Sequence, residues 1–422
     1  MTLSAEQRAA RARVVVTGLG IVSPLGIGVE DAWHAAREGR ACAATITGFD
    51  ASRVETHFAC EVPGFVPDDF MDRKTARRMD RFAQLGVAAG RLALADAGIT
   101  VGDDNRESIG AVVGSGIGGL DSFVGQTGLV AERGPDRVSP FFIPLVTVNM
   151  AAAHVSMQTG IQGPLSCVST ACATGNHAIG DALMAIRGGM ADVMLAGGTE
   201  AGVTEVGLAA FNAMRALSTR NDDPPRASRP FDAGRDGFVM GEAAAIVVLE
   251  ERAHALARGA DIYCEVVGFG MTGDAHHMTE PDPSGRQVAR AMSIAIADAG
   301  ATPEDVDYVN AHATSTPAGD GKEIVAITSA LGAARAAEVA VSSTKGMHGH
   351  CMGATGGLEA GLTALTIRDG VIPPTINLDE LDPACVGVDH VVNVAREGRV
   401  RLALSNGFGF GGHNAVVAFA AP

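Results

Sequence analysis

The sequence has little aromatic character and lacks cysteines spaced as metal or redox motifs. Aromatic residues make up 4% of its 422 positions, whereas glycine occurs 54 times. The seven cysteines are scattered, and no two have the CxxC spacing of zinc ribbons. This pattern predicts a reduced protein without a disulfide framework. Abundant glycine with few aromatics favours tight turns and close backbone packing, as in layered α/β folds.

An export signal and a long apolar run are also missing. Charged residues interrupt residues 1–13, and no apolar stretch is long enough to cross a bilayer. We therefore expect a cytoplasmic protein that binds no membrane. The net charge of −16 argues against nucleic-acid binding, and an acidic partner would need a local basic patch on this chain.

Nucleotide and metal motifs are absent or incomplete. The chain contains neither a P-loop nor a GxSxG nucleophile elbow. Gly114–Gly119 fits GxGxxG, but no second strand with an acidic residue follows at the separation that a dinucleotide site needs. His348, His350 and Cys351 lack a fourth ligand at familiar zinc spacing. We therefore expect neither a nucleotide cofactor nor a metal.

β-Branched runs alternate with alanine-rich stretches along the chain, which is typical of βαβ units in a layered sheet. Residues 13–17 predict a first strand, followed by a glycine turn over residues 18–26. Residues 262–270 repeat this strand-and-glycine pattern. This repeated pattern predicts two related halves, residues 1–260 and 261–422.

One segment of the first half breaks the alternation. Residues 221–241 are rich in Asp, Pro and Arg, and we interpret them as a long surface loop.

Cys172 is the strongest candidate for a reactive residue. Small residues flank it, and the helical pattern of residues 178–186 follows at once. A thiol at a helix N-terminus feels the positive end of the helix dipole, which favours the reactive thiolate. The alternative interpretation is a buried structural cysteine.

Three later segments combine polar reactive residues with glycine. Residues 310–320 carry His312 just past an expected strand, and residues 341–359 carry Lys345 and two histidines. The glycines of residues 405–414 let the backbone approach a ligand and offer N–H donors to an oxyanion. A cysteine and histidines that are distant in sequence are the residue types that nucleophilic acyl transfer uses.

Together these segments resemble the β-ketoacyl-[acyl-carrier-protein] synthases, most closely the synthase II type of the thiolase-like superfamily. The resemblance covers essentially the whole chain. It rests on four motifs: Ser169–Cys172, Val309–His312, Ser343–Lys345 with Gly349–His350, and Gly407–Gly412.

The resemblance implies an α/β thiolase-like fold of two duplicated βαβ halves, stacked as α-β-α-β-α layers. The first half would carry Cys172, and the second would carry His312, Lys345 and His350. It also implies an acyltransferase that condenses an acyl thioester with malonyl-acyl-carrier protein in fatty acid elongation. Such an enzyme uses no organic or redox cofactor, because its substrates arrive on the phosphopantetheine arm of the carrier. It works as a dimer.

Each candidate site residue has a role by this likeness. Cys172 would be the acylated nucleophile, His312 and His350 would assist decarboxylation, Lys345 would accompany them, and Glu359 would order the site. The backbone N–H groups of Cys172 and Phe410 would form the oxyanion hole. The remaining roles are pantetheine binding by Thr314 and Thr316, an acyl pocket and gate of Ile117, Phe142, Phe408 and Phe410, and carrier docking by Lys74, Arg77, Arg78, Arg215 and Arg220.

Some positions depart from the pattern, and other functions stay open. Ala313 replaces a glycine, Cys351 replaces a leucine and His413 replaces a threonine, so the acyl specificity is not fixed. The alternative of the same class is a type II polyketide ketosynthase paired with a homologous chain-length factor. A non-catalytic partner subunit would lack the nucleophile, and a cysteine hydrolase would need a His-Asn or His-Asp relay.

Overall fold

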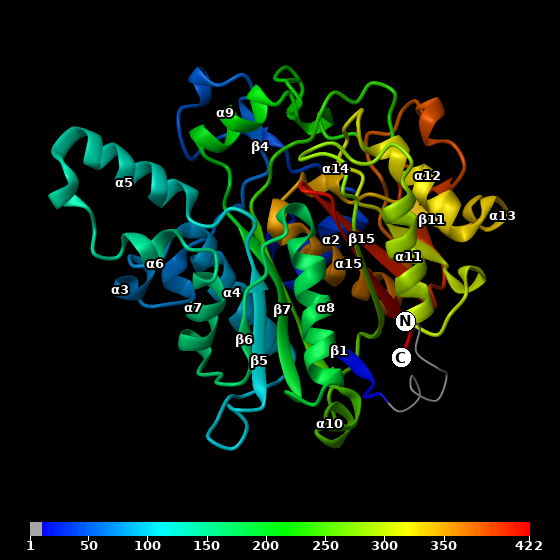
Figure 1. The fold of residues 1–422 in the computed structure, drawn as a ribbon, viewed down its shortest axis with the longest axis horizontal. Helices are drawn as coiled ribbons and strands as arrows, with labels where there is room; N and C mark the ends of the chain where they lie inside the picture. The colour runs from blue at the N-terminus through cyan, green and yellow to red at the C-terminus, as the bar shows by residue number, and fades with distance from the viewer. Residues whose placement is uncertain (1–10) are drawn as a thin grey trace.

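The computed structural model describes residues 11–422, and a single large sheet with helices on its faces forms their framework (Figure 1). The sheet has 12 strands, and its order is β13-β11-β10-β15-β16-β9-β1-β8-β7-β5-β6, with β2 paired to β1. The strands of the first half are β1 (Val14–Ser23), β2 (Gly26–Ile27), β5 (Ile109–Gly114), β6 (Leu165–Ser166), β7 (Val193–Glu200) and β8 (Ala243–Glu251). Those of the second half are β9 (Cys264–Gly273), β10 (Tyr308–Asn310), β11 (Ala340–Ser342), β13 (Asp389–His390), β15 (Leu402–Gly409) and β16 (His413–Ala420).

The two halves have the same strand order. Without β2 and β13, each half has five strands, and the first strand pairs with the fifth, followed across the sheet by the fourth, second and third. The senses of pairing also match, since β5 is parallel to β7 as β10 is parallel to β15. The halves join where β1 and β9 pair antiparallel at Val15 and Val16. A duplicated α/β fold is therefore confirmed. The division at residue 260 stays a prediction, because the halves share one hydrogen-bonded sheet.

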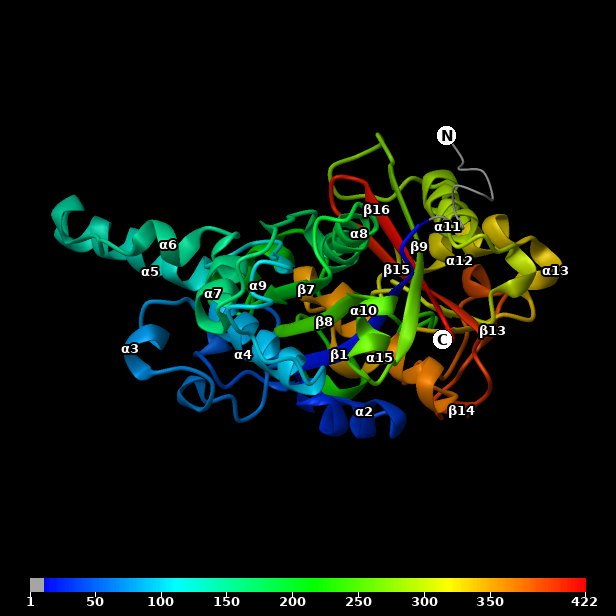
Figure 2. The same ribbon diagram turned by 90° about the horizontal axis from the view of Figure 1, so that it is seen from below.

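Helices cover the strands in layers (Figures 1 and 2). The helices α4 (Arg81–Asp96) and α7 (Met150–Thr159) pack on the first half, and α11 (Arg286–Asp298) packs on the second half with α12 (Asp320–Leu331) beside it. The helices α8 (Thr174–Arg187) and α15 (Thr355–Asp369) contact each other and strands of both halves. Residues 355–367 of α15 are all buried, so this helix lies in the middle of the molecule.

The other helices and short strands lie around this framework. They are α2 (Val29–Arg37), β3 (Ala44–Thr45), β4 (Phe58–Ala59), α3 (Arg73–Ala76), α5 (Leu120–Arg133), α6 (Phe142–Val146), α9 (Glu205–Ala213), α10 (Arg252–Ala257), α13 (Ala333–Ala336), α14 (Lys345–His348), β12 (Val371–Ile372) and β14 (Arg396–Glu397). Within residues 11–422, every helix is too short or too polar to span a bilayer.

The expected glycine turn after the first strand is wrong, because β1 continues to Ser23. A Cβ atom added to Gly20 would lie 1.9 Å from the carbonyl oxygen of Ala89 in α4. In β9, a Cβ added to Gly270 would lie 2.0 Å from the carbonyl oxygen of Ala291 in α11. The repeated glycines therefore let a helix pack directly on the strand backbone of each half.

Residues 221–226 lie at the surface as predicted, but most of residues 227–241 are buried. The buried charged side chains Arg229, Asp232 and Arg235 are paired within the protein. The Nε of Arg229 lies 2.9 Å from Asp232 Oδ1, and the Nη1 of Arg235 lies 2.6 Å from Asp382 Oδ2. Buried charges need such partners, and the composition of the segment does not reveal them.

Replacing Gly270 with Ala tests the close strand–helix packing. The added methyl group must displace α11, so we expect the free energy of unfolding to fall by about 1–3 kcal/mol. Denaturant unfolding followed by circular dichroism measures this change. Gly273→Ala in the same strand is the matched control, because its Cβ meets nothing within 4 Å. Equal stabilities of the two variants would contradict the packing argument.

Candidate active site

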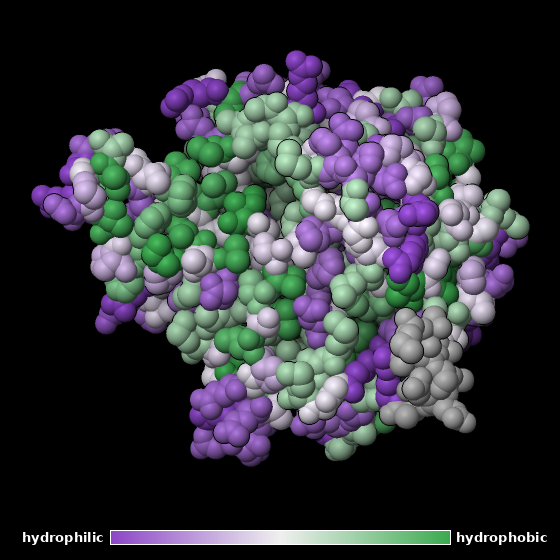
Figure 3. Space-filling view, in the orientation of Figure 1, coloured by the Kyte–Doolittle hydropathy of each residue, from purple (hydrophilic) through white to green (hydrophobic). Residues whose placement is uncertain are grey.

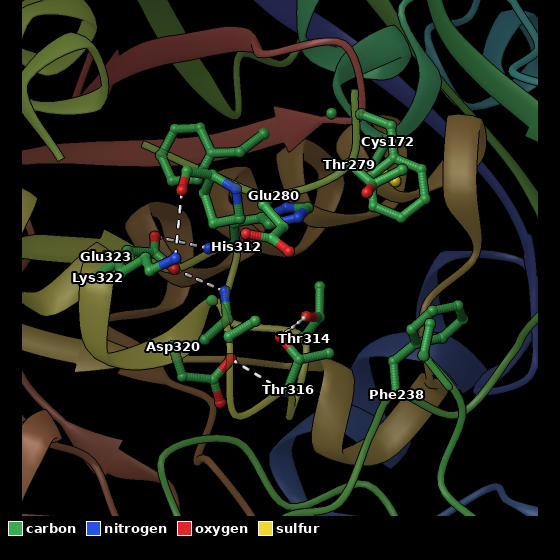
Figure 4. A pocket seen from close by; sticks show the side chains of 18 of the residues that line it. Cys172, Phe238, Thr279, Glu280, His312, Thr314, Thr316, Asp320, Lys322 and Glu323 are labelled. Atoms are coloured by element: carbon green, nitrogen blue, oxygen red, sulfur yellow. Dashed lines mark hydrogen bonds between the residues drawn. The ribbon is translucent and has the colours of Figure 1, made fainter. Parts of the chain in front are cut away.

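A pocket of about 430 Å³ brings together residues from four distant parts of the chain. Its lining includes Cys172, His312, His350, Phe408 and Phe410 (Figure 4). The two histidines follow the carboxyl ends of the neighbouring parallel strands β10 and β11, the edge where α/β sheets collect their ligands. The volume is that of a small-molecule site.

Cys172 lies in a short 3₁₀ turn that leads directly into α8. The preceding residue, Ala171, has a left-handed φ of 50°, which turns the chain sharply at this point. Burial raises the pKa of Cys172 to about 12, although Lys345 and the N–H groups of Phe410 and Cys172 act to lower it. The expectation of a resting thiolate is therefore wrong, because desolvation outweighs the helix terminus. The N–H groups of Phe410 and Cys172 lie close to this sulfur, and their role as an oxyanion hole stays a prediction.

The rings of His312 and His350 lie 5.5 Å apart between centroids, at an angle of 87°. Burial holds the pKa of each well below its usual value, and the nearby Lys345 lowers it further. Both imidazoles are therefore neutral at pH 7. The hydroxyl of Thr355 lies 3.1 Å from Nδ1 of His350, and Nε2 of that ring has no partner within residues 11–422. A hydroxyl that donates to Nδ1 leaves Nε2 protonated and free to donate to a ligand.

Glu323 fixes the backbone that carries His312. Its carboxylate accepts the N–H of His312 at 2.8 Å, the N–H of Ala313 at 2.7 Å and the amide of Asn406 at 2.9 Å. Neither Glu323 nor Thr355 was identified from the sequence. A signal for Glu323 was present, since it stands in the first turn of a helix that begins directly after the His312 segment.

A buried ion pair lies behind the pocket. The ammonium of Lys345 donates to Glu359 Oε1 at 2.6 Å, and both side chains are about 1% exposed. Burial raises the pKa of Glu359 to about 7, and Lys345 opposes this rise. Neither residue lines the pocket, so Lys345 acts on the two histidines through its charge.

The glycine loop Gly114–Gly119 holds a protein carboxylate. Glu200 accepts the N–H of Gly116 at 2.7 Å, the N–H of Ile117 at 3.1 Å and the hydroxyl of Ser115 at 2.7 Å. The N–H groups that a phosphate would need are therefore engaged, consistent with the rejection of a dinucleotide site.

The other candidate residues divide between the pocket and the remaining surface. Those that also line the pocket are Thr314, Thr316 and Arg215. The hydroxyl groups of the two threonines lie 3.1 Å apart, and the ring of Phe408 lies 5.4 Å from that of His312. Those outside this pocket are Ile117, Phe142, Lys74, Arg77, Arg78 and Arg220.

Two groups of these outlying residues adjoin, because the guanidinium of Arg78 lies 4.9 Å from the ring centroid of Phe141, next to Phe142. Phe142 contacts Phe123 of α5, with 5.9 Å between ring centroids. The exposed Lys74, Arg77 and Arg78 lie on or directly after α3, which both ribbon views place apart from α9 and its neighbour Arg215 (Figures 1 and 2).

Comparisons with known proteins agree with this geometry. The family model "Beta-ketoacyl synthase, N-terminal domain" matches residues 11–255, and "Beta-ketoacyl synthase, C-terminal domain" matches residues 263–379. The chain is 50% identical to 3-oxoacyl-[acyl-carrier-protein] synthase 2 of Vibrio cholerae over 408 residues, which cover 96% of this chain and 98% of that protein.

Two solved structures are similar over nearly the whole chain. The ishigamide ketosynthase/chain length factor has a TM-score of 0.91 and 36% identity, covering 98% of this chain and all of that one. A type II polyketide ketosynthase in complex with its acyl-carrier protein has a TM-score of 0.88 and 30% identity, with the same coverage.

The raised pKa of Cys172 predicts how its alkylation depends on pH. Only the thiolate reacts with iodoacetamide, so the rate should rise about tenfold per pH unit from pH 7 to 10 without a plateau. Peptide mass spectrometry resolves the labelling of Cys172 from that of the other cysteines. A plateau near pH 8 would show instead that the helix terminus and Lys345 outweigh burial.

Proposed function

The chain belongs to the beta-ketoacyl synthase family, and from this membership we propose that it condenses an acyl thioester with malonyl-acyl-carrier protein. The product is a 3-oxoacyl-acyl-carrier protein, and the reaction extends a fatty acid chain. The observation that carries this proposal is a thiol and two neutral imidazoles in one pocket. A hydrolase would instead need a base that activates water or the thiol.

The first half-reaction transfers the acyl group to Cys172. The sulfur attacks the thioester carbonyl, and its proton passes to the sulfur of the departing carrier. The N–H groups of Cys172 and Phe410 hold the oxyanion of the tetrahedral intermediate. The intermediate collapses, the carrier thiol leaves with a proton, and Cys172 keeps the acyl group as a thioester.

The second half-reaction forms the carbon–carbon bond. Malonyl thioester loses CO2, and its electron pair passes into an enolate whose oxygen accepts N–H bonds from His312 and His350. Neutral rings donate these bonds without a metal. The enolate carbon attacks the acyl carbonyl, the bond to the sulfur of Cys172 breaks, and the sulfur takes up a proton from water, which restores the thiol. Burial, together with the charge of Lys345, keeps both imidazoles neutral throughout.

Carrier-borne substrates need a channel and a docking surface. Thr314 and Thr316 line the pocket wall and offer hydroxyl groups to the amides of the phosphopantetheine arm. Arg215 at the pocket, and the exposed Lys74 of α3, supply positive charge to an acidic carrier. Arg77, Arg78 and Arg220 extend these two clusters. A solved relative binds its acyl-carrier protein.

No cofactor enters this chemistry, and the seven free cysteines suit a reducing cytoplasm.

A second copy of the chain completes the assembly in this proposal. The arm formed by α5 and α6 projects from the body and has no buried residue (Figures 1 and 2). Apolar residues gather over α5, α6 and α7 on this face (Figure 3). Phe123, Phe141 and Ile143 are exposed by 50%, 40% and 64%. A helix of 14 residues is marginal without packing, so this face needs a partner.

The acyl pocket is expected at the same interface. Ile117 and Phe142 lie outside the Cys172 pocket within one chain, so the arm of one copy would bring Phe142 toward the pocket of its partner. The alternative is a heterodimer with a homologous chain-length factor, and one solved relative is a ketosynthase/chain length factor. The 50% identity to a 3-oxoacyl-[acyl-carrier-protein] synthase 2 favours the fatty acid enzyme, and for that enzyme we propose a homodimer.

Substitutions of Cys172 separate the two half-reactions. Cys172→Ala should abolish chain extension, because no thioester forms on the enzyme. Cys172→Gln should release CO2 from malonyl-carrier protein without extension, because the imidazoles that stabilise the enolate remain. Radiolabelled CO2 release and mass spectrometry of the carrier measure both reactions. Undiminished extension by Cys172→Ala would overturn the proposed function, and absence of CO2 release by Cys172→Gln would overturn the division between thiol and imidazoles.

The exposed apolar arm predicts the oligomeric state of the purified chain. We expect a dimer by light scattering and a shift to monomer in Ile143→Asp, since a buried carboxylate at the interface is costly. Val394→Asp, on a residue 75% exposed in the other half, is the control and should remain a dimer. A monomeric unmodified chain would contradict the homodimer and support the heterodimer.

A further inference from the structure

The mouth of the pocket is acidic apart from two cations. Four carboxyl side chains line the part of the wall that does not contact the histidine backbone, namely Asp236, Asp274, Glu280 and Asp282. The cationic side chains in the same lining are Arg215, at the end of α9, and Lys322, in the first turn of α12. A negatively charged ligand that enters this mouth is repelled unless a cation meets it.

Lys322 is held in place by a neutral partner. Its ammonium donates to the carbonyl oxygen of Pro281 at 3.2 Å, across the pocket edge between α12 and residues 274–285. Within the described part of the chain, Lys322 forms no ion pair with a carboxylate. An ammonium has three N–H donors, so two remain for a ligand.

Lys322 lines the pocket that contains Cys172, so the two remaining N–H donors of its ammonium are available to a substrate that enters this pocket. His312, Thr314, Thr316 and Lys322 line one wall of the pocket, and all four side chains are partly exposed. Figure 4 shows Lys322 on the side of the pocket opposite Cys172, beside Glu323. Lys322 also lines a second pocket together with the exposed Pro317 and Ala318, so its charge lies at the surface end of this wall.

We propose that Lys322 binds the phosphodiester of the phosphopantetheine arm, and that it is a positioning residue for every carrier-borne substrate. This inference rests on the proposed function, because it assumes that arm. The thioester end of the arm is the part that reaches Cys172, its amides follow at the threonines, and its phosphate is the anionic group farthest from the sulfur. Lys322 is the cation on the threonine wall, and its charge compensates for the surrounding carboxylates.

Two substrates that differ only in the phosphate test this role. Malonyl-phosphopantetheine and malonyl-pantetheine present the same thioester without a carrier protein, and CO2 release gives kcat and KM for each. The unmodified enzyme should have a lower KM for the phosphorylated substrate. Lys322→Gln should lose about tenfold or more of that preference, the effect of removing one charge-assisted hydrogen bond. Its KM for malonyl-pantetheine should not change.

Two further variants separate phosphate binding from a structural clamp. Lys322→Arg keeps the charge and should retain most of the preference. Arg290→Gln removes an exposed cation from the neighbouring helix α11 and should leave both KM values unchanged. If Lys322→Gln raises both KM values equally, the residue only ties α12 to Pro281, and the proposal fails.

Measurements on the unmodified enzyme distinguish failure of the proposed role of Lys322 from failure of the proposed condensing function. Equal KM values for the two substrates would overturn the role of Lys322 while leaving the condensing function intact. No CO2 release from either substrate, or from malonyl-carrier protein, would overturn the proposed function itself.

Discussion

The buried ammonium of Lys345 is the charge on which the site depends. It adds to the burial that lowers the pKa values of His312 and His350, opposes the burial that raises the pKa of Cys172, and forms the 2.6 Å ion pair with Glu359. A charge in a dry interior acts over longer distances than one in water, because little solvent screens it. One lysine thus shifts the pKa values of four buried groups without lining the pocket. The imidazoles stay neutral donors, which is the state that an enolate oxygen needs.

Two buried carboxylates position the backbone around this charge. Glu323 accepts the N–H groups of His312 and Ala313, and Glu200 accepts those of the glycine loop beside Cys172. Each carboxylate is almost fully buried and is satisfied by donors that cannot move without breaking several bonds. The reactive side chains therefore stand on loops that behave as rigid elements. Such preorganisation lets N–H donors stabilise developing charge without reorganisation during the reaction.

The sequence predicted the parts of this site that form local motifs. It failed where packing between segments distant in sequence determines the environment of a residue. The motifs around Cys172 and His312 identified residues that the fold brings into one pocket. Glu323 was missed because its role depends on a contact that the sequence does not show: its carboxylate accepts the N–H groups of His312 and Ala313, just after β10. The raised pKa of Cys172 was missed because burial is invisible in a motif. In the same way, the sequence predicted a turn at Gly20, although a helix packs on this strand residue, and a surface loop over residues 221–241, although Arg229, Asp232 and Arg235 are buried and paired.

The duplication explains why thiol and imidazole converge at all. Cys172 stands in a 3₁₀ turn before α8, and a matching 3₁₀ turn (Met352–Ala354) follows His350 and leads into α15. Ala171 and Met352, at the same point of the two turns, have φ values of 50° and 47°. The helix ends touch, since a Cβ added to Gly175 would lie 2.5 Å from the backbone nitrogen of Gly357. One supersecondary unit, used twice, therefore brings two helix N-termini together in the centre of the molecule. The first copy acquired a nucleophile and the second a histidine, so a site that needs both groups requires that both halves be folded and docked.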